Sequence, residues 1–305
     1  MGGQSDAQPH LRSWLALFAV YIFWGTTYLG IRVALESFPP ALLLGLRFTL
    51  SGAILLIAGR ALKMTLPSGA EFRRTVLCGF LTLGVGTGCL CMAEQWVPSG
   101  LAALFITLSP FWMLAVDALI PGGDRFHKPV LWGMMIGLVG TLLLVAPIGG
   151  SAGLDIGKGK LALGFLVLQV GTLGWCVGSI WQRRSTTTVH PVMSGAVQQI
   201  TVGVLVLIPS LLVQGREAHW DRQGAGSILY LATFGSIIGY SAFLYIMDTM
   251  PIAIVTTYNY VNPVVAVMLG WLFYREPLGV RELTAMAIIF LGVAVVRRMQ
   301  AQRGI

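Results

Sequence analysis

The sequence predicts an all-α integral membrane protein with ten transmembrane helices, arranged as two inverted five-helix repeats. Of its 305 residues, 56% are hydrophobic and only 10% are charged, and the mean hydropathy is +0.79. Soluble domains carry roughly a quarter charged residues, so a lipid bilayer is the predicted solvent of this chain. The other two observations are a series of apolar runs long enough to cross a bilayer and an internal repeat.

Ten apolar runs, bounded by charges, prolines or glycine clusters, are the predicted helices. They cover residues 13-33, 41-62, 74-94, 98-120, 129-148, 160-182, 191-214, 226-248, 252-273 and 281-298. The first run is too long for a signal-peptide core and no small-residue cleavage motif follows it, which predicts a retained helix. The polar break at 149-159 lies near the middle of the chain and divides it into predicted repeats 13-148 and 160-298.

The repeat is clearest in two stretches that begin with prolines 153 residues apart, PSGLAALFITLSP and PIAIVTTYNYVNP. They end at Pro110 and Pro263. A proline inside a helix cannot donate to the carbonyl four residues earlier, so the carbonyls of Ile106 and Asn259 are predicted to be freed near mid-membrane. The resulting kinks either improve helix packing or lie beside a substrate path with a gating role.

Further matches support the repeat at offsets of 151 to 152 residues. The matched pairs are Trp24 with Trp175, Arg47 with Gln198, Gly52 with Gly203, and Gly140 with Gly292. Small residues predicted to allow close helix packing are Gly84, Gly86, Gly88, Gly133, Gly137 and Gly140. An odd number of helices per repeat makes the second half enter the membrane from the opposite side, and such inverted repeats are typical of secondary transporters. Lys and Arg are more numerous on the side of the two termini, which are therefore predicted to be cytoplasmic.

Several other classes of protein are disfavoured. The formal net charge of +8 does not indicate nucleic-acid binding, because the basic residues lie in short spans between apolar segments and set topology. The four cysteines lie in apolar segments without a nearby histidine, so neither a disulfide framework nor a zinc site is predicted. Protease motifs and a complete P-loop are missing. We therefore expect no catalytic residue, metal, cofactor or nucleic-acid partner, and an intramembrane enzyme is only a remote alternative.

Aromatic and polar side chains at mid-helix depth are the candidate substrate-binding residues. Arg47 lies about seven residues into the second predicted helix, where it either binds a substrate carboxylate or snorkels to the interface. The other candidates suit a ligand with an apolar body and polar handles, although such aromatics also serve packing and interfacial belts. They are Trp24, Tyr28, Phe105, Trp175, Tyr258 and Asn259.

Proton coupling usually needs a titratable group deep in the membrane, whereas the acids of this chain lie near the ends of the predicted helices. Glu94, Asp117 and Asp248 are the candidates. Either one of them reaches the cavity from its rim, or the protein is a facilitator that lets its substrate move down its own gradient.

Two segments carry a family resemblance, YIFWGTTYLGIRVALESFPPALLLGLRF at 21-48 and YREPLGVRELTAMAIIFLGVAVV at 274-296. Together with APIGG after the fifth predicted helix, they resemble the EamA branch of the drug/metabolite transporter superfamily. The resemblance extends over residues 13 to 298, and it looks closer to the bacterial inner-membrane YedA-like and amino-acid-exporter groups than to nucleotide-sugar carriers. It implies ten helices in two inverted halves that export small metabolites, amino acids or drugs. Multidrug relatives with four helices depend on a first-helix glutamate, which is missing here before Glu36, so inherited proton-drug antiport is in doubt.

We therefore expect a secondary transporter that exports small metabolites, above all amino acids, across a bacterial inner membrane by alternating access. In this mechanism the kinked fourth and ninth helices move with the first and sixth around a central aromatic cavity. A proton-coupled exporter of multiple drugs or cationic compounds is the alternative. The expected partners are a small-molecule substrate and the lipid bilayer, and the chain is expected to act as a monomer, with a dimer as the alternative.

Overall fold

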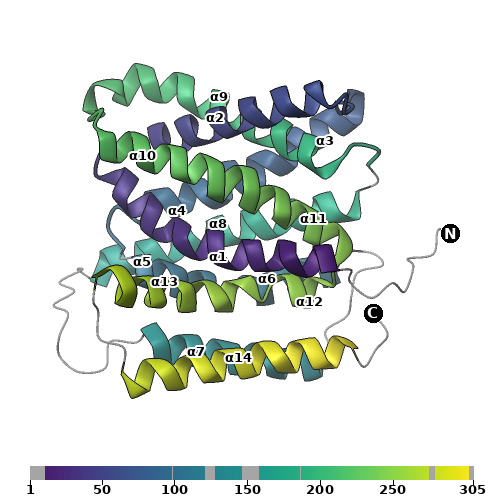
Figure 1. Ribbon diagram of the computed structural model, residues 1–305, viewed down its shortest axis with the longest axis vertical. Helices are drawn as coiled ribbons and strands as arrows, with labels where there is room; N and C mark the ends of the chain where they lie inside the picture. The colour runs from purple at the N-terminus through teal and green to yellow at the C-terminus, as the bar shows by residue number, and fades with distance from the viewer. Residues whose placement is uncertain are drawn as a thin grey trace.

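The computed structural model describes residues 11–97, 99–120, 128–145, 158–185, 187–274 and 279–301. Over these residues the protein is helical and contains no strand, as the sequence predicts. The longer helices lie side by side in a bundle (Figure 1). Among the described residues, six helical stretches are long and apolar enough to cross a membrane, and three shorter apolar helices accompany them.

The first half of the chain contains the elements up to α7. They are α1 (Leu11–Leu35), α2 (Pro40–Ala61), α3 (Gly69–Gly79), the π-helical η1 (Phe80–Thr87), α4 (Gly88–Ala93), α5 (Ser99–Ile106), α6 (Ser109–Leu119) and α7 (Lys128–Val145). Pro40 occupies the first turn of α2, where its missing N–H costs no helical hydrogen bond. Lys63 follows α2 with a φ of 58°, which turns the chain before α3 begins.

The second half contains the remaining elements. They are α8 (Lys158–Arg184), α9 (Pro191–Gln214), η2 (Gly215–Glu217), α10 (Arg222–Tyr230), the π-helical η3 (Leu231–Tyr240), α11 (Ser241–Thr249), α12 (Ile252–Val255), α13 (Tyr258–Tyr274) and α14 (Val280–Ala301). Asp221 caps α10, because its Oδ1 accepts a 2.7 Å hydrogen bond from the Gly224 amide. The His190 imidazole accepts one of 3.3 Å from the Val192 amide at the start of α9.

Both proline-bounded stretches form interrupted helices, but the interruptions fall at different places. α5 ends at Ile106 and α6 begins at Ser109, so Pro110 lies in the first turn of α6, where proline is tolerated. In the second repeat the break lies at residues 256–257, between α12 and α13, and Pro263 is inside α13. The two prolines therefore have different helical environments despite their matching places in the repeat.

Two π-helical segments occupy equivalent places in the two halves. η1 begins at Phe80 and η3 at Leu231, 151 residues later. The sequence predicted plain helices here, because the hydrophobic pattern of a π segment is not distinct from that of an apolar α-helix. π turns are rare and occur frequently at functional sites. Their matched positions indicate that both repeats use the same local distortion.

Repeat-equivalent helices pack against each other at two seams, the first between α2 and α9. A Cβ atom on Gly52 would lie 2.3 Å from the backbone nitrogen of Ile200, and one on Gly203 would lie 2.3 Å from that of Thr49. Neither position has room for a side chain. The matched glycines therefore allow the two helix backbones to touch, as expected of small residues at membrane-helix interfaces.

The second seam joins α7 and α14, which lie together at the lower edge of Figure 1. A Cβ atom on Gly292 would lie 2.5 Å from the Gly137 nitrogen, and one on Gly140 would lie 2.8 Å from the Ile289 nitrogen. These distances confirm the close packing predicted for this helix. Gly88 differs, because a Cβ atom there would meet its nearest neighbour at an ordinary 3.6 Å.

Candidate functional site

A cavity lies within the bundle and is lined from both halves of the chain. It contains about 770 Å³ of space free of protein atoms, a volume that includes the part open to solvent. The elements α1, α2, η1, α4, α5 and α6 line it from the first half, and α8, η3 and α13 line it from the second. The aromatic and larger polar members of the lining include Trp24, Tyr28, Arg47, Trp175, Ser236, Tyr240, Tyr258, Asn259 and Asn262.

An aromatic cluster centred on Trp24 forms one wall of the cavity. The Trp24 ring lies 5.3 Å from Trp175 and 5.0 Å from Tyr258, edge-on to both, and 5.0 Å from Phe243. Edge-to-face pairs at such distances are favourable because the positive ring edge meets the negative ring face. Trp24 and Trp175 are repeat-equivalent, so the repeat brings its own two tryptophans together in the middle of the molecule.

Trp24 is also tied to η3, because its Nε1 donates a 3.0 Å hydrogen bond to the backbone oxygen of Gly235. Asn259 is buried at the start of α13, where its Nδ2 donates to the Thr256 oxygen at 3.1 Å across the interruption between α12 and α13. Tyr28 is buried in the lining as well. These contacts hold the predicted residues of three helices around one space.

Arg47 is a buried cation in the cavity wall. Its side chain is only 5% exposed, and its Nε donates a 2.8 Å hydrogen bond to Ser236 Oγ of η3. A Cβ atom on Gly235 would lie 2.7 Å from Arg47 Nη2, so the glycine leaves the room that the guanidinium fills. Among the described residues, no carboxylate lies within ion-pair distance of Arg47. The lining therefore contains a positive charge without a protein counter-charge.

The equivalent position of the second repeat differs from Arg47. Gln198 is fully buried, its Oε1 accepts a 2.6 Å hydrogen bond from the Tyr240 hydroxyl, and its Nε2 donates to Gln182 Oε1. Both ends of this amide are thus used within the protein. Gln198 is not part of the cavity lining, in which Arg47 is the charged side chain among the described residues.

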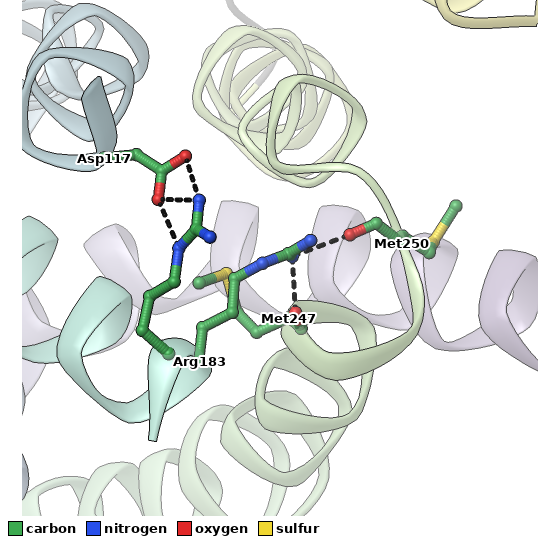
Figure 2. A network of polar contacts seen from close by, with 5 residues as sticks. Asp117, Arg183, Met247 and Met250 are labelled. Atoms are coloured by element: carbon green, nitrogen blue, oxygen red, sulfur yellow. Dashed lines mark hydrogen bonds and ion pairs between the residues drawn. The ribbon is translucent and has the colours of Figure 1, made fainter. Parts of the chain in front are cut away.

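The end of the bundle at which α1 begins is held together by two arginines of α8 (Figure 2). Arg184 binds the fully buried Asp117 of α6 with Nε at 2.9 Å and Nη2 at 2.7 Å from Oδ1, and Nη2 also lies 2.8 Å from Oδ2. Arg183 Nη1 donates to the backbone oxygens of Met247 at 2.5 Å and Met250 at 2.8 Å. These contacts join α6, α8 and α11 beyond the cavity.

Other predicted residues lie outside the cavity lining. The ring of Phe105 packs edge-on at 5.1 Å against Phe165, in a smaller hydrophobic cluster. Asp248 is exposed in the last turn of α11. Glu94 directly follows α4, and both of its carboxylate oxygens are buried. Of the predicted acids, Asp117 is thus the one fixed by an arginine, and Glu94 is the one enclosed near the cavity.

The residues of the site that sequence reasoning missed include Gly235, Ser236 and Phe243. A signal for the glycine exists, because Gly84 and Gly235 are separated by the same 151 residues as the two tryptophans. Ser236 and Phe243 carry no comparable signal, since small polar and aromatic residues are common in membrane helices.

A membrane-spanning helical bundle whose two halves line one central cavity defines a membrane transporter as the class of this protein. Residues 11–146 and 162–298 match the EamA-like transporter family, so the chain belongs to that family of drug/metabolite transporters. The family match and the names of its relatives describe transporters rather than enzymes.

Individual relatives cover nearly the whole chain. It is 36% identical over 283 residues to the "Uncharacterized inner membrane transporter YedA" of Escherichia coli K12, covering 92% of this chain and 89% of the relative. It is 27% identical over 292 residues to the "Probable amino-acid metabolite efflux pump" of Salmonella typhimurium, covering 92% and 93%. A crystal structure with 21% identity has the same fold, with a TM-score of 0.76 over 94% of this chain and 98% of the other.

Proposed function

We propose that this transporter exports small amphipathic metabolites that carry a carboxylate, with amino acids as the main class. The observation that supports this most strongly is the buried Arg47 in the cavity wall, which has Ser236 as its hydrogen-bond partner and no carboxylate beside it among the described residues. A buried cation is costly unless it is paired, and a bidentate carboxylate is the partner that best fits a guanidinium. The substrate itself would supply that partner.

The aromatic cluster around Trp24 provides the complementary surface for the apolar part of the substrate. Its rings form one wall, whereas Arg47 and Asn259 are polar lining residues. A cavity with many apolar and few polar groups orients an amphipathic ligand, because only one end of the ligand finds hydrogen-bond partners. Aromatic and large aliphatic amino acids are therefore the first substrates to test.

The proposed architecture has ten transmembrane helices in two inverted halves, approximately 13–148 and 160–298, with both termini in the cytoplasm of a bacterial inner membrane. It is consistent with the odd number of predicted helices per half and with the excess of Lys and Arg beside the termini. The contacts of Arg183 and Arg184 then close the cytoplasmic end. Alternating access would break these contacts while the interrupted helices at Pro110 and Pro263 move. We propose that a monomer carries out this cycle.

Counterflow in proteoliposomes tests the proposal with matched substrates. Purified protein is reconstituted with unlabelled L-phenylalanine inside the vesicles, and uptake of labelled L-phenylalanine is compared with that of labelled phenylalaninamide. The two compounds share one apolar body, and only the first has a carboxylate. We expect exchange of phenylalanine alone. Equal exchange of both compounds would contradict a carboxylate site, and no exchange of phenylalanine or of other apolar amino acids would contradict the proposed substrate class.

Substitution of Arg47 by Gln gives the residue that the second repeat has at the equivalent place. Charge-assisted hydrogen bonds contribute about 1.5–3 kcal/mol, so KM for phenylalanine should rise by about tenfold to a hundredfold. Arg60→Gln is the matched control, because Arg60 lies on the same helix but is exposed at its end. Cationic drugs are the alternative substrates, and the charge of Arg47 opposes them. Tetraphenylphosphonium uptake that exceeds phenylalanine uptake would favour that alternative.

A further inference from the structure

Glu94 has an unusual position for an acid in this protein. It is the first residue after α4, one helical turn beyond Leu90, which lines the cavity. Both of its carboxylate oxygens are buried, and neither has a hydrogen-bond partner among the residues that the structure describes. An ionised carboxylate in such a place would bear the full free-energy cost of desolvation, so these surroundings accommodate the neutral, protonated acid.

Four other acids of the described chain are paired or exposed. Asp117 is bound by Arg184, and Glu71 accepts hydrogen bonds from Thr187 and the Thr188 amide. Glu36 is exposed and accepts a 3.0 Å hydrogen bond from Gln223 Nε2 at the same end of the bundle as Glu94. Asp248 is exposed as well. Burial without a partner therefore distinguishes Glu94 from these acids.

The elements around Glu94 present few ionisable groups. α1 contributes Arg32, whose charge favours the ionised acid, and Tyr28, which lines the cavity. α4 itself carries the buried Cys91. α5 has no ionisable side chain, and residues 159–182 of α8 include two ionisable side chains, the exposed Lys160 and the buried Cys176. Arg32 is exposed, so its charge is screened by water and does not replace a direct partner.

We propose that Glu94 is the proton-binding residue of this transporter and that its proton exchanges for the substrate. One proton from the side opposite the termini binds a Glu94 carboxylate oxygen and forms the neutral acid that these buried surroundings accommodate. When the conformational change admits water from the side of the termini, the O–H bond breaks, the proton passes to water and the carboxylate remains. One proton then enters for each substrate molecule that leaves. This inference rests on the proposed export function.

The first test needs no substrate. Infrared titration of the purified protein follows the carbonyl stretch of a protonated carboxylic acid, which an ionised carboxylate lacks. We expect the wild type to show such a band near neutral pH and Glu94→Gln to lack it. Glu36→Gln, which changes an exposed acid at the same end of the bundle, should leave the band unchanged. A wild-type spectrum that Glu94→Gln does not alter at any pH would overturn the proposal.

The second test separates coupling from transport. Proteoliposomes with an interior about one pH unit more acidic than the exterior, and with the membrane potential clamped, are supplied with labelled L-phenylalanine. A one-proton exchange supports accumulation up to about tenfold under these conditions. Glu94→Gln should retain counterflow but lose accumulation, so its internal concentration reaches only the external one. Glu36→Gln should behave like the wild type.

The outcomes separate the two proposals. Accumulation that persists in Glu94→Gln, or wild-type counterflow without any accumulation, would overturn the role of Glu94 and leave the export function intact. No wild-type counterflow of phenylalanine would refute that substrate, and the infrared titration would still decide whether Glu94 binds the proton. If Glu94→Gln does not fold, Glu94→Asp replaces it. This variant keeps a carboxyl group and should keep accumulation, so normal counterflow without accumulation in it would contradict the proposal.

Discussion

Disruption of the Asp117–Arg184 ion pair should open the end of the bundle at which α1 begins. Asp117 is 0% exposed, whereas the Arg184 side chain is 28% exposed. Loss of one partner from a buried pair costs about 3–5 kcal/mol, but the free-energy difference is smaller when the remaining charge reaches water. For Asp117→Asn the remaining arginine is partly solvated, so we expect about 1–3 kcal/mol. Arg184→Gln removes the bidentate partner of a fully buried carboxylate and should have the larger effect.

Cys176 provides a native probe of this opening. It is buried on α8, eight residues before Arg184 and therefore about 12 Å from it along the helix, between the cavity wall at Trp175 and the ion pair. In a variant whose other three cysteines are replaced by serine, the rate of modification by N-ethylmaleimide reports how often water reaches Cys176. A shift of 1–3 kcal/mol in the conformational equilibrium corresponds to about 5- to 150-fold faster modification.

Two further variants make this test specific. Asp248→Asn alters an exposed acid at the same end and should change the rate less than twofold. The double variant Asp117→Asn with Arg184→Gln should be modified no faster than Arg184→Gln alone, because the two residues act through one interaction. Unchanged modification in both single variants would refute the view that this ion pair keeps the end closed.

Three other predictions concern packing and the cavity. Gly52→Ala should lower the free energy of unfolding by about 1–3 kcal/mol, because its Cβ would overlap the Ile200 backbone. Gly226→Ala, at a position that faces open space in α10, should not destabilise the protein. Thermal denaturation in detergent compares the two variants. Ser236→Ala should raise KM for phenylalanine several-fold, because it removes the hydrogen-bond partner of Arg47 Nε. Ser241 has a buried hydroxyl without a partner among the described residues, so Ser241→Ala should leave KM unchanged. An equal rise of KM in both variants would contradict the role of Ser236. Trp24→Phe keeps an aromatic ring but loses the hydrogen bond to the Gly235 backbone oxygen, so the free energy of unfolding should fall by about 0.5–1.5 kcal/mol. Unchanged thermal stability and KM would show that this hydrogen bond contributes nothing.

The helical class and the repeat were predictable because both produce regular patterns in the amino-acid sequence. Runs of apolar residues indicate membrane helices, and equal offsets between matched residues indicate duplication. Two pairs related by the offset of 151 also lie close together in the structure, because Trp24 contacts Trp175 and the glycines at 52 and 203 lie at the same seam. A repeat predicts contacts of this kind when equivalent elements of the two halves pack against each other.

Local distortions were harder to predict. Matching prolines predicted matching kinks, yet Pro110 begins a helix and Pro263 lies within one. The reason is that a proline removes one hydrogen bond but does not decide on which side of it the helix is interrupted; neighbouring helices decide that. The π segments η1 and η3 likewise have no distinct hydrophobic pattern.

In the candidate site, too, the sequence indicated which residues are unusual but not which neighbours surround them. The sequence identified Arg47 and Trp24 as unusual residues at mid-helix depth, and both line the cavity. Phe105 satisfied the same criterion but packs in another cluster, because period and depth do not specify which neighbour a helix face meets. Only the tertiary structure could show that.

Pairing of charged and polar groups also depends on contacts between residues distant in the chain. Arg47 binds Ser236, 189 residues away in the chain, and Arg184 binds Asp117, 67 residues away, whereas the Glu94 carboxylate has no hydrogen-bond partner among the described residues. The sequence thus specified the membrane setting, the helices and the duplication, since these follow from hydrophobicity and local geometry. The tertiary structure alone decided which charges are satisfied, because burial and hydrogen bonding depend on the helices that pack around each side chain.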